Sequence, residues 1–265
     1  MLFKAQFKKR TPFEDFIEVS KRLFLRDCAQ KFGEYKLGVL WALVEPIVHI
    51  LTFTLMLSRS AQTHDDLIHI PMFVMSGLIP FLLFRNTIKG VMTACKTNKA
   101  AFFFPKVKPL HAVASKVWFE CFVYTLSFVV IFSTLQYFSY APDEPLNAVM
   151  LLGAVLFIIA IGLGLGLIAM VLREFVPSIE KWINILLRPL YFLSSIFYSV
   201  SVIPKQYHFV FEYNPCVHVI EFTRHAMLGQ EPVFASWFYL GEFALLTNFV
   251  GFTLFAIYKD KLRSK

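Results

Sequence analysis

The chain has 265 residues, of which 57% are hydrophobic and 17% aromatic, and its mean hydropathy is +0.60. This composition excludes a soluble globular domain and predicts an all-α integral membrane protein. The formal net charge is +8. Membrane topology and anionic lipid account for such an excess of basic residues, so no nucleic-acid partner is needed to explain it.

An amphipathic helix is predicted near the N-terminus, over residues 11–31. Thr11 suits the N-cap position, Pro12 the first helical position, and Glu14 completes a capping box. Apolar side chains then share one face with charged residues opposite. We expect this helix to lie in the membrane interface, or to pack on another subunit, and the two possibilities are compatible.

Six apolar segments follow, each about as long as a helix that crosses a bilayer. They divide the chain into a cytoplasmic N-terminus (1–36), a transmembrane domain (37–258) and a cytoplasmic tail (259–265). The predicted spans are 37–57, 70–92, 113–136, 148–171, 182–203 and 236–258.

The basic residues predict the orientation. Of the 26 lysines and arginines, only Arg59, Lys205 and Arg224 fall in segments that are outside when the N-terminus is inside. Positive residues favour the cytoplasmic side. Both termini are therefore predicted to be cytoplasmic.

The first span carries ionisable residues. Glu45 and His49 are four residues apart and share a helix face, next to Pro46, which should kink the helix or begin a new turn. Glu45 is either part of a functional path or a shallow acid paired with a basic residue.

Two polar loops differ in character. Loop 58–69, with its histidines and aspartates, matches no metal-ligand spacing and is predicted to be a solvated loop without a metal site. Cytoplasmic loop 93–112 surrounds exposed aromatic residues with lysines, which is typical of an interaction site, although anchoring at the membrane surface is the alternative. Its candidate contact residues are Lys96, Lys99, Phe103, Pro105 and Lys106.

Two further motifs concern helix packing. Gly162 and Gly166 form a G-x-x-x-G face within an apolar span and predict close helix contact. Segment 204–235 is apolar but interrupted at Asn214-Pro215, which predicts re-entrant helices before the last span. Glu221 and Arg224 are three residues apart and suit an ion pair there.

The sequence lacks a phosphate-binding G-x-x-x-x-G-K-[ST] loop, a zinc-protease motif and a nucleophile elbow. No cofactor is expected on this chain, and active transport would need an energy source from another chain.

Gly38, Trp41 and Pro46, which follow an amphipathic helix, resemble the ABC-2 type membrane subunits of ATP-binding-cassette exporters. Asn214, Pro215, Glu221 and Arg224 before the last span are similar to that family's pattern. Length and layout most resemble the inner-membrane permease of group 2 capsular polysaccharide export. Exporters of O-antigen or teichoic acid are the alternative within the family. Besides a transport subunit with a partner ATPase, two other classes remain open: a membrane enzyme acting on lipid-linked sugars, and a passive channel or scaffold.

The resemblance implies a homodimeric permease in the bacterial inner membrane. It also implies a separate ABC ATPase that binds ATP and Mg and contacts loop 93–112. Spans one and five of both copies would line the conduit, and flat aromatic faces there can stack on sugar rings. The path candidates in these two spans are Trp41, Glu45, His49, Phe53, Tyr191, Phe197 and Tyr198. The cargo would be a lipid-linked polysaccharide, passed to a periplasmic adaptor and an outer-membrane export protein.

Overall fold

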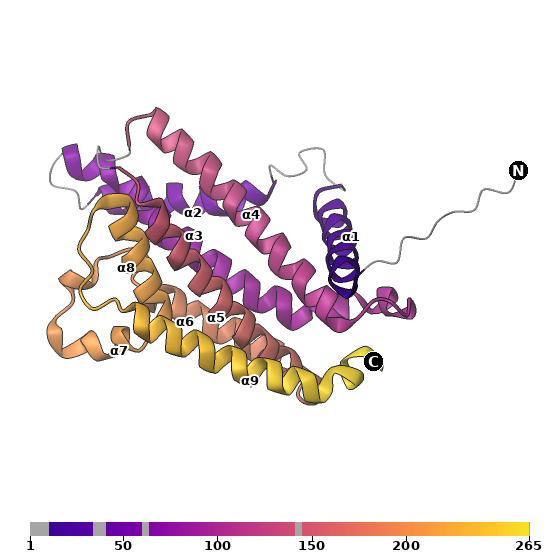
Figure 1. The fold of residues 1–265 in the computed structure, drawn as a ribbon. Coiled ribbons are helices and arrows are strands. Elements are labelled where there is room, and N and C mark those ends of the chain that lie inside the picture. The colour runs from indigo at the N-terminus through magenta and orange to yellow at the C-terminus, as the bar shows by residue number, and fades with distance from the viewer. Residues whose placement is uncertain (1–10, 34–40, 60–63, 141–144, 265) are drawn as a thin grey trace, which may run out of the picture.

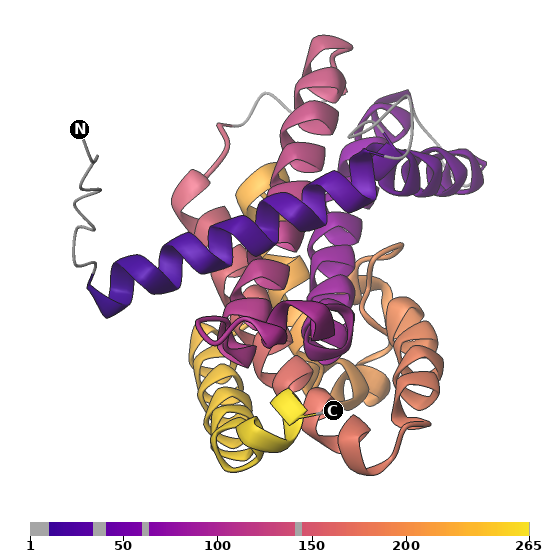
Figure 2. The same cartoon turned by 90° about the vertical axis from the view of Figure 1, so that its right-hand side faces the viewer.

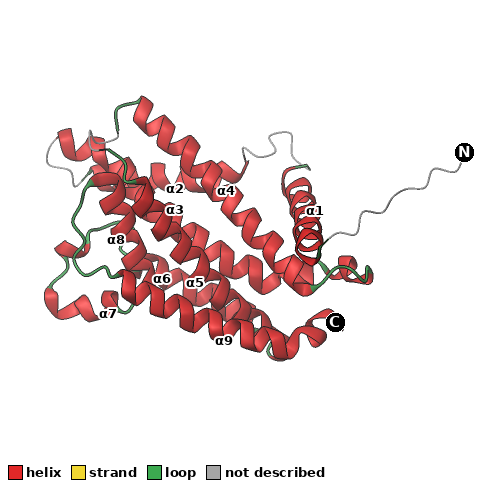
Figure 3. Cartoon of the chain, in the orientation of Figure 1, coloured by secondary structure: helices red, strands yellow, loops and turns green. Residues whose placement is uncertain are grey.

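The computed structural model describes residues 11–33, 41–59, 64–140 and 145–264. Within these ranges every regular element is helical (Figure 3). Short 3-10 turns occur at Lys99–Phe103, Val200–Val202 and Lys205–Tyr207. The α-helices are α1 (Pro12–Phe32), α2 (Trp41–Ser58), α3 (His64–Thr97), α4 (Pro109–Tyr137), α5 (Ala148–Phe175), α6 (Ile179–Leu193), α7 (His208–Glu212), α8 (Pro215–Leu228) and α9 (Trp237–Ser264).

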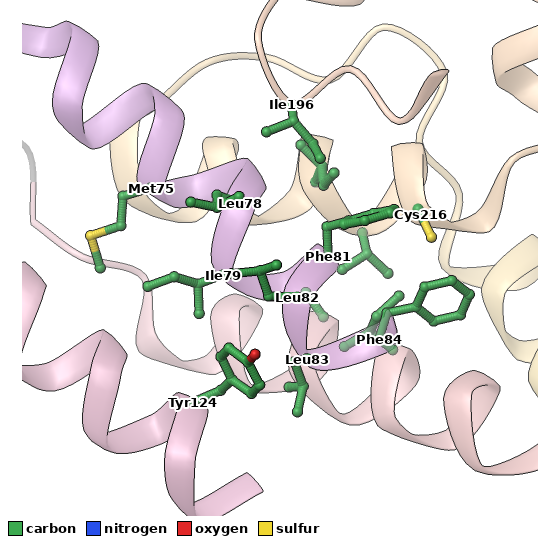
Figure 4. Packing of buried hydrophobic residues seen from close by; sticks show 14 of the residues in the cluster. Met75, Leu78, Ile79, Phe81, Leu82, Leu83, Phe84, Tyr124, Ile196 and Cys216 are labelled. Atoms are coloured by element: carbon green, nitrogen blue, oxygen red, sulfur yellow. The ribbon is translucent and has the colours of Figure 1, made fainter. Parts of the chain in front are cut away.

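Helices α3 and α5 form the centre of the bundle. Helix α3 packs against α2, α4, α5 and α8, and α5 also packs along α9. The main core surrounds α3, where Leu78 and Leu82 are fully buried next to Ile196 of the segment after α6 (Figure 4). Most of α3 is therefore screened from lipid by other helices.

Close helix contact at the glycines is confirmed. A Cβ atom at Gly162 or Gly166 would meet side chains of α3, at 3.1 Å from Thr87 and 2.7 Å from Val91 respectively. Gly164 lies on another side of α5, where a Cβ atom would come within 2.7 Å of the backbone of Thr247 in α9. The glycines therefore let α5 approach two neighbours at once.

Four helices in the described residues are long and apolar enough to cross a membrane: Ile70–Thr97, Pro109–Tyr137, Ala148–Phe175 and Trp237–Leu262. The apolar part of α2, Leu43–Ser58, is shorter. The predicted fifth span, 182–203, is wrong in its second half, because α6 ends at Leu193. Ser195 then adopts a positive φ of 53°, which interrupts a helix.

The bundle has two distinct ends. One end carries α1, the turn between α3 and α4, and the C-terminal end of α9, and α1 runs across it (Figures 1 and 2). The other end carries α7 and the start of α8 (Figure 1).

The solvated loop predicted for 58–69 is wrong over its second part, since α3 begins at His64. The predicted tail is helical through Ser264.

Helix α1 begins as predicted. Thr11 Oγ1 accepts a hydrogen bond from the Glu14 backbone N–H, and the Glu14 carboxylate accepts one from the Thr11 N–H. The helix packs on α4, burying Ser20, Leu23 and Asp27. Asp27 therefore lies on the face that contacts the bundle, although it is charged.

Candidate functional site

A cavity of about 480 Å³ lies between α2, α3 and α6. Its walls bring together two of the predicted path residues, His49 and Tyr191. Its lining combines aromatic rings with basic side chains: His49, Phe81, Arg85, Lys89, Asn184, Leu187, Arg188, Tyr191 and Phe192. We call this cavity the basic aromatic pocket.

Tyr191 is at the centre of the aromatic wall. Its ring centroid lies 5.2 Å from that of Phe81, 5.1 Å from that of Phe197, and 6.2 Å from those of His49 and Phe53. Phe53 stacks on Phe197 at 3.7 Å. The Tyr191 hydroxyl is buried without a hydrogen-bond partner in the described part of the chain. It is thus free to bond to a polar ligand, and the rings offer faces for sugar stacking.

The lining of the basic aromatic pocket carries more positive than negative charge. Arg85 forms an ion pair with Glu45, so this acid has a basic partner, as one of its two interpretations predicts. His49 Nδ1 lies 2.7 Å from the Glu45 carbonyl oxygen, one helical turn away. Within the described ranges, Lys89 and Arg188 take part in no ion pair. The pocket therefore presents uncompensated positive charge, which favours an anionic group.

Tyr198 is separated from this pocket. Its hydroxyl donates a hydrogen bond to the Phe192 carbonyl at 2.7 Å, and its ring packs edge-on against Phe211. It belongs to a small cluster with Val200 and Val217. Trp41 begins α2, but the placement of its side chain lies outside the description, as does Gly38 entirely. Pro46 is buried inside α2.

The segment that follows α6 is held by Arg224 of α8. The guanidinium donates to the carbonyls of Ser195 at 2.5 Å, Ile196 at 2.9 Å and Tyr198 at 3.0 Å. It also lies 3.8 Å from the centre of the Phe73 ring. These bonds satisfy carbonyls that the interrupted helix cannot.

Other residues of the same motif support this segment. Asn214 Nδ2 donates to the Leu193 carbonyl at 3.1 Å, and its Oδ1 accepts from the Cys216 N–H at the start of α8. The Glu221 carboxylate accepts from the backbone N–H groups of Val233 and Phe234. The predicted ion pair of Glu221 with Arg224 is wrong, because each side chain bonds to backbone groups on a different side of α8.

The five candidate contact residues of loop 93–112 lie exposed around one turn. Phe102 anchors the turn in the core with 7% of its surface exposed, while Phe103 is 89% exposed. Nearby, Glu180 at the start of α6 pairs with Arg173 at 3.1 Å and approaches Lys96 at 4.0 Å. The turn thus offers an aromatic and basic surface: Lys96, Lys99, Phe103, Pro105 and Lys106.

A buried ion pair joins α1 to the bundle, and sequence reasoning missed it. Lys116 Nζ of α4 lies 2.9 Å from Asp27 Oδ2, and both side chains are mostly buried. Arg26 bonds to Asp27 at 3.0 Å and to Asn98 at the end of α3. The only sequence signal is that Asp27 falls on the apolar side of the predicted helix.

Three relatives resemble the chain over most of its length. The chain is 34% identical to the polysialic acid transport protein KpsM of Escherichia coli, over 93% of this chain and 95% of the relative. It is 26% identical to the capsule polysaccharide export inner-membrane protein CtrC of Neisseria meningitidis, over 83% and 84%. It is 21% identical to the capsule polysaccharide export inner-membrane protein BexB of Haemophilus influenzae, over 86% and 87%.

The sequence model of one family, ABC-2 type transporter, matches residues 19–228. The matched region begins within α1 and ends with α8, so it includes the basic aromatic pocket, the exposed turn and the Arg224 network. The chain therefore belongs to the ABC-2 type transporter family of membrane proteins.

Proposed function

We propose that the chain is the permease subunit of an ATP-binding-cassette exporter that moves a lipid-linked capsular polysaccharide across the bacterial inner membrane. The basic aromatic pocket carries this proposal, because it combines sugar-stacking rings with uncompensated Lys89 and Arg188. An acidic polymer or a phosphate-bearing lipid end suits that chemistry. The relatives named for polysialic acid and capsule export support the same class of cargo.

The proposed topology has six crossings with both termini in the cytoplasm. Helices α3, α4, α5 and α9 are long enough to span, and α2 crosses as a shorter helix. The fifth crossing in chain order consists of α6 and the segment held by Arg224, and α9 is the sixth. Helices α7 and α8 enter the membrane from the outer side. Irregular backbone is tolerated there because protein side chains satisfy it. A homodimer would place two basic aromatic pockets along one conduit.

The proposed energy source is a separate ABC ATPase that binds ATP and Mg, and this chain acts as a transport subunit rather than an enzyme. The ATPase would contact the exposed turn at Phe103, Pro105 and Lys106. The ion pairs of Glu180 link this turn to α6, which forms one wall of the basic aromatic pocket. Movement of the turn would thereby be transmitted through α6 to the wall of the pocket. A periplasmic adaptor and an outer-membrane export protein would receive the polymer.

The test is transport by the chain with its ATPase in inverted membrane vesicles, measured with a labelled lipid-linked acidic polysaccharide. Arg188→Gln should lower uptake severalfold while leaving assembly with the ATPase unchanged. Arg22→Gln is the matched control, since Arg22 is exposed on α1 and away from the pocket. Equal transport by both variants would contradict a role for the pocket.

The other function classes give distinct results in the same assay. Uptake without ATP would indicate a passive channel. Chemical conversion of the lipid-linked saccharide by the chain alone would indicate a membrane enzyme. Preferential uptake of an O-antigen or teichoic acid polymer would keep the exporter class and change its cargo.

A further inference from the structure

A second cavity, of about 240 Å³, opens on the other side of α3 from the basic aromatic pocket. Residues at positions 75, 79 and 83 of α3 line it, whereas those at 81 and 85 line the pocket. Figure 4 shows Met75 and Ile79 directed toward the side of Tyr124, and Phe81 directed toward Cys216. We call this second cavity the apolar crevice.

The walls of the apolar crevice come from α3, α4, α5 and α8, and nearly all of its lining is hydrocarbon. Three of its four polar side chains already have hydrogen-bond partners, and the fourth, Thr125, lies exposed. Thr223 Oγ1 donates to the Ser76 carbonyl at 2.9 Å, Ser76 Oγ donates to the Phe73 carbonyl at 2.8 Å, and the Tyr124 hydroxyl accepts from Asn86. A polar ligand would therefore gain few bonds there, and water would lose bonds.

The crevice exists because α4 and α5 scarcely touch, although they are consecutive in the chain. The start of α5 is instead tied to α8, since the Asn147 N–H donates to the Ala226 carbonyl at 2.9 Å. Helix α4 packs on α1 and α3. The gap between α4 and α5 therefore faces outward, where Thr125 and Leu152 of the lining are exposed.

We infer that the apolar crevice holds an acyl chain of a resident bilayer phospholipid. The two helices that flank its mouth are both long and apolar enough to span, so hydrocarbon surrounds it. An empty cavity would forfeit dispersion contacts that a methylene chain restores. Its position across α3 from the basic aromatic pocket separates this lipid from the cargo. The inference rests on membrane embedding and not on the identity of the polymer.

The lipid chain would contact α8, the helix that carries the motif residues Glu221 and Arg224. Thr223 and Met227 of α8 line the crevice, and Arg224 of the same helix holds the segment after α6. Filling the crevice would thus brace α8 on a face adjacent to the one from which Arg224 bonds to Ser195 and Ile196.

The experiment uses the full chain in nanodiscs of phosphatidylethanolamine and phosphatidylglycerol, with a fraction of the phosphatidylethanolamine carrying a diazirine in its acyl chain. After irradiation, adducts are mapped by mass spectrometry. Met75 and Met227 are buried at 0% and 4% exposure, so free bilayer lipid does not reach them. We expect adducts at both, well above those at Met170, which is equally buried but lines neither cavity.

A matched pair of variants tests the location. Leu152→Trp fills the mouth of the apolar crevice, and Leu246→Trp makes the same change at an equally exposed site on α9. The first should reduce the Met75 and Met227 adducts to the level at Met170, and the second should leave them unchanged. Normal adducts on the outer face of α9 show that each variant is folded. A further variant, Thr125→Trp, fills the mouth of the crevice from the α4 side and should have the same effect as Leu152→Trp.

Three results would overturn the inference. Adducts at Met75 and Met227 that do not exceed those at Met170 would mean that no lipid enters. Disulfide formation between copies of a Thr125→Cys variant would mean that a second copy covers the mouth. Labelling of the two methionines by a diazirine-bearing lipid-linked saccharide, and not by phosphatidylethanolamine, would assign the crevice to the cargo.

Discussion

Arg224 Nη2 donates a hydrogen bond of 2.5 Å to the carbonyl of Ser195, at the point where the chain leaves the axis of α6. The partner residue has a positive φ, and the Ile196 backbone follows against α3. At that contact a Cβ atom on Gly77 would come within 3.1 Å of the Ile196 Cα, so a larger residue would require the Ile196 backbone to shift. Arg224 therefore fixes the position of Phe197, which stacks on Phe53 of α2.

Replacing Arg224 by methionine should destabilise the chain and abolish export. The side chain is 3% exposed, and its loss leaves three carbonyls without their donor. Each unsatisfied buried acceptor costs roughly 1–3 kcal/mol, so the total should be at least about 3 kcal/mol. Thermal unfolding in detergent and vesicle transport measure the two effects.

Arg224→Lys separates geometry from charge. Lysine keeps the charge but lacks the planar fork that reaches several carbonyls, so we expect partial stability with little transport. Arg22→Ala is the surface control, because its ion pair with Glu18 is exposed and should contribute less than about 0.5 kcal/mol. Full transport by Arg224→Lys would show that the bonding geometry at Ser195 is dispensable.

The sequence motifs identified the important residues around α8 but not their partners. Resemblance points to Asn214, Glu221 and Arg224, and the i, i+3 spacing of the last two predicts an ion pair between them. The observed partners are backbone groups of segments 193–198 and 233–234. Such partners exist only once the chain has folded back, so no local spacing can reveal them.

Apolar length predicted most of the helices, because a span must satisfy its own backbone bonds. It failed at 194–203, which is apolar enough to extend α6 but interrupted at Ser195. Similarly, the structure brings Tyr191 and Phe197 together with Phe53, whereas Tyr198, next in sequence to Phe197, lies in another cluster. Composition indicates which residues suit sugar contact, while the direction of each side chain depends on the helix break.

Gly164→Ala should weaken the packing of α5 on α9. The added methyl group would lie 2.7 Å from the Thr247 backbone carbon and 2.8 Å from the Asn248 backbone nitrogen, neither of which can rotate away. Overpacking of this kind costs about 1–3 kcal/mol. The melting temperature in detergent should therefore fall.

Gly241→Ala on α9 provides the matched control for that substitution. A Cβ atom there would have no neighbour closer than 4.0 Å. Because alanine favours helix over glycine by up to about 1 kcal/mol, this variant should be neutral or slightly more stable. An equal fall in melting temperature for both variants would show that the α5–α9 contact is not the cause.

The exposed turn allows a test of ATPase coupling that is separate from stability. Phe103→Ala should leave the melting temperature unchanged, since the ring has few contacts, but reduce co-purification of the ATPase. Phe102→Ala should cost about 3–5 kcal/mol, because that ring is buried. Phe209→Ala, an exposed aromatic change at the opposite end of the bundle, should alter neither quantity. Normal ATPase binding by Phe103→Ala would mean that the ATPase contacts another surface of the chain.

The ion pair of Asp27 with Lys116 should show coupling between α1 and α4. Asp27→Asn removes the ion-pair partner of the mostly buried Lys116 and should destabilise the docking of α1 by about 3–5 kcal/mol. Lys116→Met should cost less, because Asp27 keeps its ion pair with Arg26. The double variant should recover part of this loss, because neither charge is then left unpaired. Limited proteolysis of α1 measures its docking. Additive losses in the double variant would mean that the two charges act independently, with Asp27 serving mainly Arg26 and the end of α3.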